Sequence, residues 1–177
     1  NGFMWFATAE GLHRYDGYGF KIYKHHLRDS LSLSSNHIQA ICEDGNGNIW
    51  VGTEPGDLNR FDKATGHVER LLIIDQEGQP NRYPINCLTI DRDGSLMVGL
   101  DGGGIVVYHP KTKVQKHFHS SNSNLTNNYV KSFNKEINGL GVWVGAAQGL
   151  SLFQEGQFKT FSSLKIFDNQ FVSDVLH

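Results

Sequence analysis

The chain has 177 residues, 20 of them glycine, and a net charge of −2. This near-neutral charge argues against nucleic acid as a partner, because a phosphate backbone needs a basic stripe to neutralise it. No apolar run approaches the roughly 18 residues that a membrane-spanning helix requires, so we expect no membrane contact by this segment.

The first residues form a short apolar strand centred on a tryptophan, and this pattern returns three times along the chain. Its anchors are 45, 47 and 46 residues apart, at Trp5, Trp50, Met97 and Trp143. Each anchor is followed two residues later by a small residue: Ala7, Gly52, Gly99 and Gly145. Self-similarity at a fixed period of this length is typical of repeat folds.

The second copy shows the repeating unit most clearly. Residues 38–43 alternate in polarity and end at a glycine-rich turn, DGNGN, and residues 49–53, 58–62 and 67–72 are three further short strands. Four short antiparallel strands in about 46 residues indicate a β-propeller blade. No stretch has the 3.6-residue period of a helix. We therefore predict an all-β propeller with about four four-stranded blades.

The repeat divides residues 1–177, a single propeller segment, into successive blades. The predicted boundaries are 1–27 for three strands of a first blade, 36–74, 83–119 and 128–162 for complete blades, and 171–177 for the first strand of a further blade. The segment is then either an arc of a larger ring or a closed four-blade ring in which the last strand completes the first blade. An arc would either self-associate through its exposed faces or pack against the remaining blades of a longer chain.

The anchor tryptophan and the glycine after it should face the same side of their strand. Trp50 and Gly52 are two residues apart, and side chains alternate across a strand. We expect Trp50 to pack between neighbouring blades and Gly52 to let the next sheet approach closely. Met97 can replace tryptophan in the third copy because methionine fills irregular gaps. Stacking against a ligand is the alternative role for these anchors.

Several residues that could carry chemistry have simpler structural interpretations. Cys42 and Cys87 lie on strands that we expect to be buried, so we favour unpaired core thiols over a bridge between neighbouring repeats. Asp44, Asp91 and Asp93 border hairpin turns, where a short acceptor satisfies free backbone amides. Calcium binding is the alternative for these three carboxylates.

We find no motif for a catalytic, metal or cofactor site. The chain has no nucleophile elbow, phosphate loop or zinc spacing. His117 and His119 share one face of an outer strand that should be exposed to solvent, and no third ligand follows nearby, so we expect no metal there. The glycine-rich segment 101–104 precedes no helix, so we interpret it as a turn.

A recognition surface should lie on the ring face formed by the loops that enter each first strand and the turns between second and third strands. These loops vary most among the repeats, as expected where a rigid scaffold carries function. Arg82, Tyr83, Asn128 and Tyr129 offer donors, acceptors and stacking faces of the kind that sugars use. A solvated loop position is the alternative for any one of them.

The sequence EDGNGNIWVGT, followed by a Leu-x-x-Phe-Asp strand, resembles the two-component regulator propeller repeat. The segment FMWFATAEGLHRYDG is similar to the same repeat, whereas the third copy has Met97 and Leu100 in place of Trp and Thr, and the fourth lacks the acidic residue. This resemblance implies the periplasmic sensor region of a bacterial signalling protein, such as a hybrid histidine kinase or a diguanylate cyclase. Propellers of this family usually have seven blades, so the resemblance favours an arc of a larger, seven-bladed ring over a closed four-blade ring.

Two functions are consistent with these observations. The first is a non-catalytic sensor module that binds a small molecule or a glycan fragment and signals to a separate output domain. The alternative is a propeller enzyme, for instance one similar to the lyases that use a histidine and a magnesium ion. An enzyme needs an acid, a base and a metal set that converge on one ring face. The histidines and aspartates show no repeated placement, so we favour the sensor.

Overall fold

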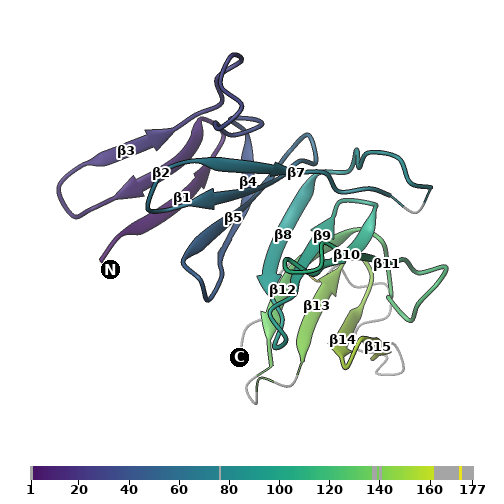
Figure 1. Ribbon diagram of the computed structural model, residues 1–177. Helices are drawn as coiled ribbons and strands as arrows, with labels where there is room; N and C mark the ends of the chain where they lie inside the picture. The colour runs from purple at the N-terminus through teal and green to yellow at the C-terminus, as the bar shows by residue number, and fades with distance from the viewer. Residues whose placement is uncertain (1, 76, 137–138, 140, 162–171, 173–177) are drawn as a thin grey trace.

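The computed structural model describes residues 2–75, 77–136, 139, 141–161 and 172 of the chain. Within these residues it contains fifteen strands in four antiparallel sheets, which we call blades 1 to 4. The blades follow one another along an open arc, with the first and the last at opposite ends (Figure 1). Neighbouring strands in each sheet are consecutive in sequence, which is the meander of a propeller blade. The prediction of an all-β propeller segment is confirmed.

The strands are short throughout, and only blade 1 has fewer than four in the described residues. Blade 1 contains β1 (Met4–Thr8), β2 (Gly11–Tyr15) and β3 (Phe20–Tyr23). Blade 2 contains β4 (Ile38–Glu43), β5 (Asn48–Thr53), β6 (Leu58–Asp62) and β7 (Val68–Leu71). Blade 3 contains β8 (Ile85–Ile90), β9 (Leu96–Leu100), β10 (Gly104–Tyr108) and β11 (Gln115–Phe118). Blade 4 contains β12 (Val130–Lys135), β13 (Val142–Ala146), β14 (Leu150–Gln154) and β15 (Gln157–Thr160).

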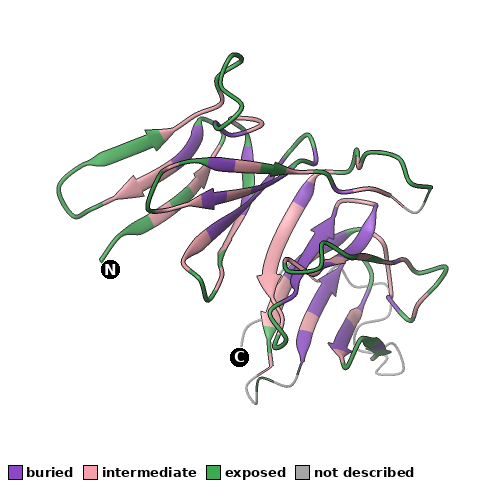
Figure 2. Ribbon diagram, in the orientation of Figure 1, coloured by how far each residue is buried: buried purple, intermediate pink, exposed green. Residues whose placement is uncertain are grey.

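The middle strands of blades 2 and 3 are buried because each lies between two other sheets (Figure 2). Trp50 on β5 packs edge-on against Tyr108 of blade 3, with 5.9 Å between the ring centroids. Trp5 packs in the same way against Phe61 of blade 2, at 5.4 Å. Each tryptophan therefore faces the aromatic residue on the third strand of the next blade. Met97, at the equivalent position of blade 3, is fully buried.

The glycine two residues after each anchor leaves room for a side chain of the next blade. A Cβ atom on Gly52 would overlap the side chain of Ile85, which enters from the first strand of blade 3. A Cβ atom on Gly99 would lie only 2.8 Å from Cγ1 of Val130 in blade 4. Real Cβ atoms do not approach carbon atoms this closely, so glycine sets the spacing between these sheets.

The first strand of blades 2, 3 and 4 carries a β-bulge directly after its first residue. The pairing with the second strand skips one polar residue in each case: Gln39, Asn86 and Lys131. Side chains alternate along a strand, so the extra residue changes the face that later side chains occupy. Ile85 therefore packs into the core shared with blade 2, whereas Cys87, two residues later, packs into the core shared with blade 4.

The described residues form an arc and not a closed four-blade ring. Among them, blade 1 has no sheet against one of its faces, which leaves Met4, Phe6 and Phe20 exposed at 58%, 38% and 61%. Of the predicted strand 171–177, only Val172 is described. Its N–H donates to the carbonyl oxygen of Ala146 at 3.1 Å, so this residue lies beside blade 4.

Candidate ligand-binding site

The loops that enter the first strands of blades 2 and 4 follow one pattern. Leu33 and Leu125 are 1% and 3% exposed and anchor each loop in the core. Three residues further on, the side-chain oxygens of Asn36 and Asn128 accept hydrogen bonds of 2.8 Å from a backbone N–H at the start of the same loop. These hydrogen bonds connect the two ends of each loop, so both asparagine side chains serve to hold the loop conformation.

The loop that enters blade 3 departs from this pattern. Residues 72–84 include a small hairpin that is closed by an antiparallel bridge between Ile74 and Pro80. Gln115 of β11 holds this hairpin: its side chain accepts a hydrogen bond from the Ile74 N–H at 3.1 Å and donates one to the Leu72 carbonyl at 2.7 Å. The hairpin therefore packs against the outer strand of blade 3.

Tyr83 occupies the position that asparagine has in the other two loops, two residues before the first strand. Its ring packs on the turn between β9 and β10, where a Cβ atom on Gly103 would lie 2.6 Å from Tyr83 Cδ2. Asn81 supports the loop by donating hydrogen bonds to the carbonyl oxygens of Tyr83 and Gly56, at 2.8 and 2.9 Å. Because Gly103 has no side chain, the ring of Tyr83 can pack directly against this turn.

A cavity of about 250 Å³ lies between this loop, the turn after β9 and the end of β11. Its lining combines carboxylates, imidazoles, an amide and an aromatic ring: Asp75, Glu77, Asn81, Tyr83, Leu100, Gly103, His117 and His119. We call it the Tyr83 cavity. Ligand pockets usually measure roughly 300–1,000 Å³, so this one suits a small ligand or one ring of a larger ligand.

A second exposed tyrosine borders the same turn. Tyr129 lies directly before β12, and together with Tyr83 it flanks Gly102. A Cβ atom on Gly102 would lie 3.3 Å from Tyr129 Cε1 and 3.4 Å from Tyr83 Cδ1. The two tyrosines are 52% and 42% exposed. Two neighbouring aromatic rings at the surface can stack against an apolar ring face of a ligand while their hydroxyl groups stay hydrated.

Asp101 contacts the chain segments that carry both tyrosines. Its N–H donates to the Pro84 carbonyl at 2.9 Å, and its backbone forms a bridge with Tyr129. Its carboxylate accepts hydrogen bonds from the Asn86 amide at 3.1 Å and the Lys131 ammonium at 2.6 Å, which are bulge residues of β8 and β12. The bond from Lys131 lowers the pKa of the Asp101 carboxyl. This network ties blade 3 to blade 4 beside the tyrosines.

The two histidines form the outer wall of the cavity. Burial lowers the pKa of His117, and the neighbouring His119 lowers it further, so His117 is neutral at neutral pH. The Nε2 atom of His117 is buried and has no hydrogen-bond partner among the described residues. The expectation of a solvent-exposed strand is wrong here because the loop before blade 3 packs against β11. Within the described part of the chain, no three metal-ligating side chains are placed to hold an ion.

The structure brings together two of the four surface residues that the sequence suggested. Tyr83 and Tyr129 meet at the turn after β9. Asn128 contributes through its backbone, because its carbonyl oxygen accepts hydrogen bonds from two N–H groups of that turn, at 3.1 and 2.9 Å. Arg82 is exposed and does not line the cavity.

Asp75 and Asn81, which line the cavity around Tyr83, were not recognised as site residues from the sequence, and His117 was considered there only as a metal ligand. One signal was present in the sequence. The loops before blades 2 and 4 share a leucine and, three residues later, an asparagine, whereas the loop before blade 3 has proline and tyrosine at these positions. Where one copy of a repeat lacks the residues that hold the loop in the other copies, that loop is a candidate for a functional role.

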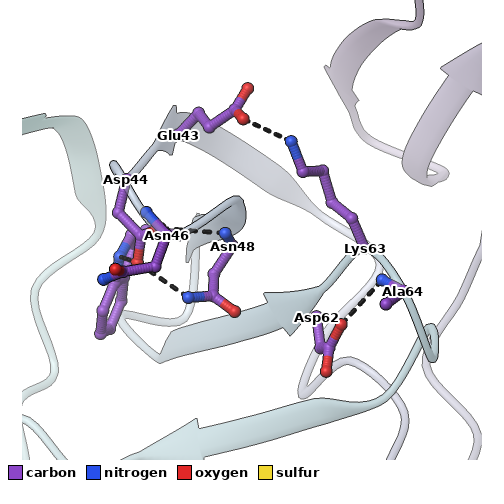
Figure 3. Close-up of polar contacts among 8 residues, drawn as sticks. Glu43, Asp44, Asn46, Asn48, Asp62, Lys63 and Ala64 are labelled. Atoms are coloured by element: carbon purple, nitrogen blue, oxygen red, sulfur yellow. Dashed lines mark hydrogen bonds and ion pairs between the residues drawn. The ribbon is translucent and has the colours of Figure 1, made fainter. Parts of the chain in front are cut away.

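A larger hollow of about 860 Å³ lies between blades 1 and 2 at the other ends of their strands. The carboxylates that blade 2 contributes already bond within that blade (Figure 3). Glu43 pairs with Lys63, and the Asp62 carboxylate accepts a hydrogen bond of 2.7 Å from the Ala64 N–H. Arg14 of blade 1 also lines the hollow, and its buried Nε has no hydrogen-bond partner among the described residues. Because the carboxylates of this hollow have partners, whereas Tyr83 is exposed in a loop that departs from the repeat, we place the candidate ligand site at the Tyr83 cavity.

Asp44, at the edge of this hollow, accounts for the sequence DGNGNIW. Its Oδ1 accepts hydrogen bonds of 2.9 Å from the N–H groups of Asn46 and Asn48, and its Oδ2 accepts one of 3.2 Å from the indole of Trp50. Burial raises the pKa of this carboxyl, but the hydrogen bonds outweigh burial and leave the pKa lowered. Asp44 therefore shapes the turn and also fixes the anchor tryptophan.

The remaining candidates for chemistry have structural surroundings. Asp91 and Asp93 each accept a hydrogen bond from a backbone N–H of their own turn, at 2.6 and 2.8 Å. Cys42 and Cys87 are free thiols. Burial raises the pKa of Cys42 to about 12 and also raises that of Cys87. A thiol with so high a pKa is not a nucleophile at neutral pH.

These features define a propeller segment that presents loops on a rigid scaffold. Residues 32–54 match the model of the two-component regulator propeller family. The chain thus carries a two-component regulator propeller repeat, as the sequence predicted. A search of curated proteins finds no match to the chain. No helix in the described residues is long and apolar enough to cross a membrane.

Solved structures extend the likeness over most of the chain. The extracellular domain of the hybrid two-component system BT3049 from B. thetaiotaomicron is 26% identical with a TM-score of 0.74, over 90% of this chain and 22% of that one. The corresponding domain of BT4673 from the same organism is 22% identical with a TM-score of 0.72, over 93% and 24%. The chain therefore spans less than a quarter of these domains.

A virginiamycin B lyase from Staphylococcus aureus also has a similar fold. It is 16% identical with a TM-score of 0.68, over 89% of this chain and 50% of the lyase. At this identity the likeness concerns the fold alone. The match to the hybrid two-component system BT3049 has both higher identity and the higher TM-score.

Proposed function

We propose that this segment belongs to the periplasmic sensor region of a bacterial signalling protein and that it recognises a ligand without transforming it. The observation that carries the proposal is the 26% identical match, over 90% of the chain, to the extracellular domain of a hybrid two-component system. The propeller repeat at residues 32–54 agrees with this assignment.

The proposed ligand is a carbohydrate that contacts the Tyr83 cavity and the neighbouring Tyr129. Aromatic faces stack against the apolar faces of sugar rings, and carboxylates and imidazoles form hydrogen bonds with hydroxyl groups. The side chains of Tyr83 and Tyr129 are exposed next to this polar cavity. Asp101 contacts Pro84, which follows Tyr83, and it also contacts Tyr129 and Lys131 of blade 4. A ligand that contacts both tyrosines would therefore alter how blade 3 packs against blade 4.

The test is a titration of the chain with a panel of neutral oligosaccharides, followed by calorimetry. Tyr83→Ala and Tyr129→Ala should each weaken binding about tenfold or more, which corresponds to about 1.4 kcal/mol. Tyr18→Ala is the matched control, since Tyr18 is 99% exposed in a turn of blade 1. Mass spectrometry should return the ligand chemically unchanged. Conversion of the ligand would favour the enzyme alternative, and equal binding by all three variants would place the site elsewhere.

A further inference from the structure

We propose that the Tyr83 cavity selects a sugar ring that carries a protonated amine. This inference rests on the proposed function, because it names the chemical class of ligand for the same site. It follows from the negative charge of the lining, the neutral ring of His117 and the aromatic face of Tyr83.

The charged groups that line the cavity are of one sign. Asp75 and Glu77 contribute two carboxylates, and neither lysine nor arginine lines the cavity. The Oδ1 atom of Asp75 accepts hydrogen bonds from the N–H groups of Glu77 and Gln79, at 2.9 and 2.8 Å. In the described part of the chain its Oδ2 has no partner, and Glu77 makes no ion pair. Both carboxylates are therefore available to a cationic ligand.

His117 does not cancel this negative charge. The pKa of His117 is lowered by burial and by the proximity of His119, so its imidazole is neutral at pH 7. With the ring proton on Nδ1, the buried Nε2 is an acceptor. This atom lacks a hydrogen-bond partner within the described residues. Because Nε2 is buried, a ligand in the cavity does not reach it, and His117 contributes a neutral wall.

The ring of Tyr83 adds a second attraction for a cation. One part of the ring rests on the glycine turn, and the side chain is 42% exposed beside the cavity. An ammonium group over an aromatic face is stabilised by the negative charge of the ring face. A ligand carboxylate or sulfate would instead meet two carboxylates, and like charges at close range disfavour binding.

The experiment compares three sugars of one ring size that differ in charge. The chain is titrated by NMR at pH 7 and constant ionic strength with glucosamine, glucose and glucuronate. We expect glucosamine to bind at least tenfold more tightly than glucose, and glucuronate to bind more weakly than glucose. Glu77→Gln should lower the affinity for glucosamine about fivefold and leave that for glucose unchanged.

Glu54→Gln is the matched control, because Glu54 is exposed in the β5–β6 turn and does not line the cavity. It should leave all three affinities unchanged. Equal affinities for the three sugars, or no effect of Glu77→Gln on glucosamine binding, would overturn the charge selection while leaving the sensor proposal to its own test. If none of the three sugars binds, the cavity is not a sugar subsite, and the oligosaccharide panel with the tyrosine variants still decides the proposed function.

Discussion

Blades 1 and 2 carry the same sequence motif, but they bury it to different degrees. Trp50 is 1% exposed, contacts Tyr108 in the next blade and donates its indole N–H to Asp44. Trp5 contacts Phe61 in the next blade but is only half-buried. Blade 2 has a first strand and a neighbouring sheet on both faces, whereas the described part of blade 1 has three strands and one neighbour. The motif therefore owes its burial to the surrounding sheets.

The largest effect should come from truncating the two tryptophans. Trp50→Ala should lower the free energy of unfolding by about 3–5 kcal/mol, as for other large aromatic residues in cores. Trp5→Ala should cost about 1–2 kcal/mol, because a half-exposed side chain loses less burial. Urea denaturation of both variants measures the difference. Equal losses in the free energy of unfolding would show that burial by neighbouring blades does not determine how much each tryptophan stabilises the fold.

A valine at the close-approach glycine tests the spacing between blades 2 and 3. Gly52→Val should destabilise the chain by about 1–3 kcal/mol, because its side chain would collide with Ile85. Gly45→Val is the control: no atom lies within 4 Å of a Cβ there, and the change should stay within about 0.5 kcal/mol. A melting temperature that is unaltered in Gly52→Val would contradict close approach.

The smallest effect concerns the carboxylate that holds Trp50. Asp44→Asn should lower stability at pH 7 by about 1 kcal/mol, through weaker hydrogen bonds to the turn and the indole. The folded pKa of Asp44 lies below its ordinary value of 3.8. Its contribution is therefore present above pH 3.8 and is lost as the pH falls through the lowered folded pKa. Denaturation between pH 7 and pH 2 should show a weaker acid destabilisation in Asp44→Asn than in the parent chain.

The fold could be predicted because its determinants recur within the chain. Trp50 and Gly52 have counterparts near every 46th position, and a period of this length with four short strands indicates a propeller. The same reasoning made Tyr83 and Tyr129 candidates for ligand contact, because they lie in loops that vary among the repeats, and this stays a prediction. The sequence did not reveal the Asp44–Trp50 hydrogen bond, since the aspartate was interpreted only as a turn residue.

The lining of the Tyr83 cavity could not be predicted in the same way. Asp75 belongs to a hairpin before blade 3, and His117 belongs to the outer strand of that blade, about forty residues later. They lie near one another because the side chain of Gln115 holds the hairpin against β11. No local period records such packing, and the loop occurs once in the chain, so no second copy exists for comparison.

The bulge in each first strand has a consequence for insertions and deletions. In β8, the skipped residue Asn86 lets Ile85 face blade 2 while Cys87 faces blade 4. Deleting Asn86 would make Ile85 and Cys87 adjacent, and plain alternation would still direct them to opposite faces and so to the same two cores. The deletion would instead remove the Asn86 amide, which donates hydrogen bonds to the Asp101 carboxylate and to the Val130 carbonyl oxygen of blade 4. Loss of this residue should therefore weaken the link between blades 3 and 4 and leave the two cores in place.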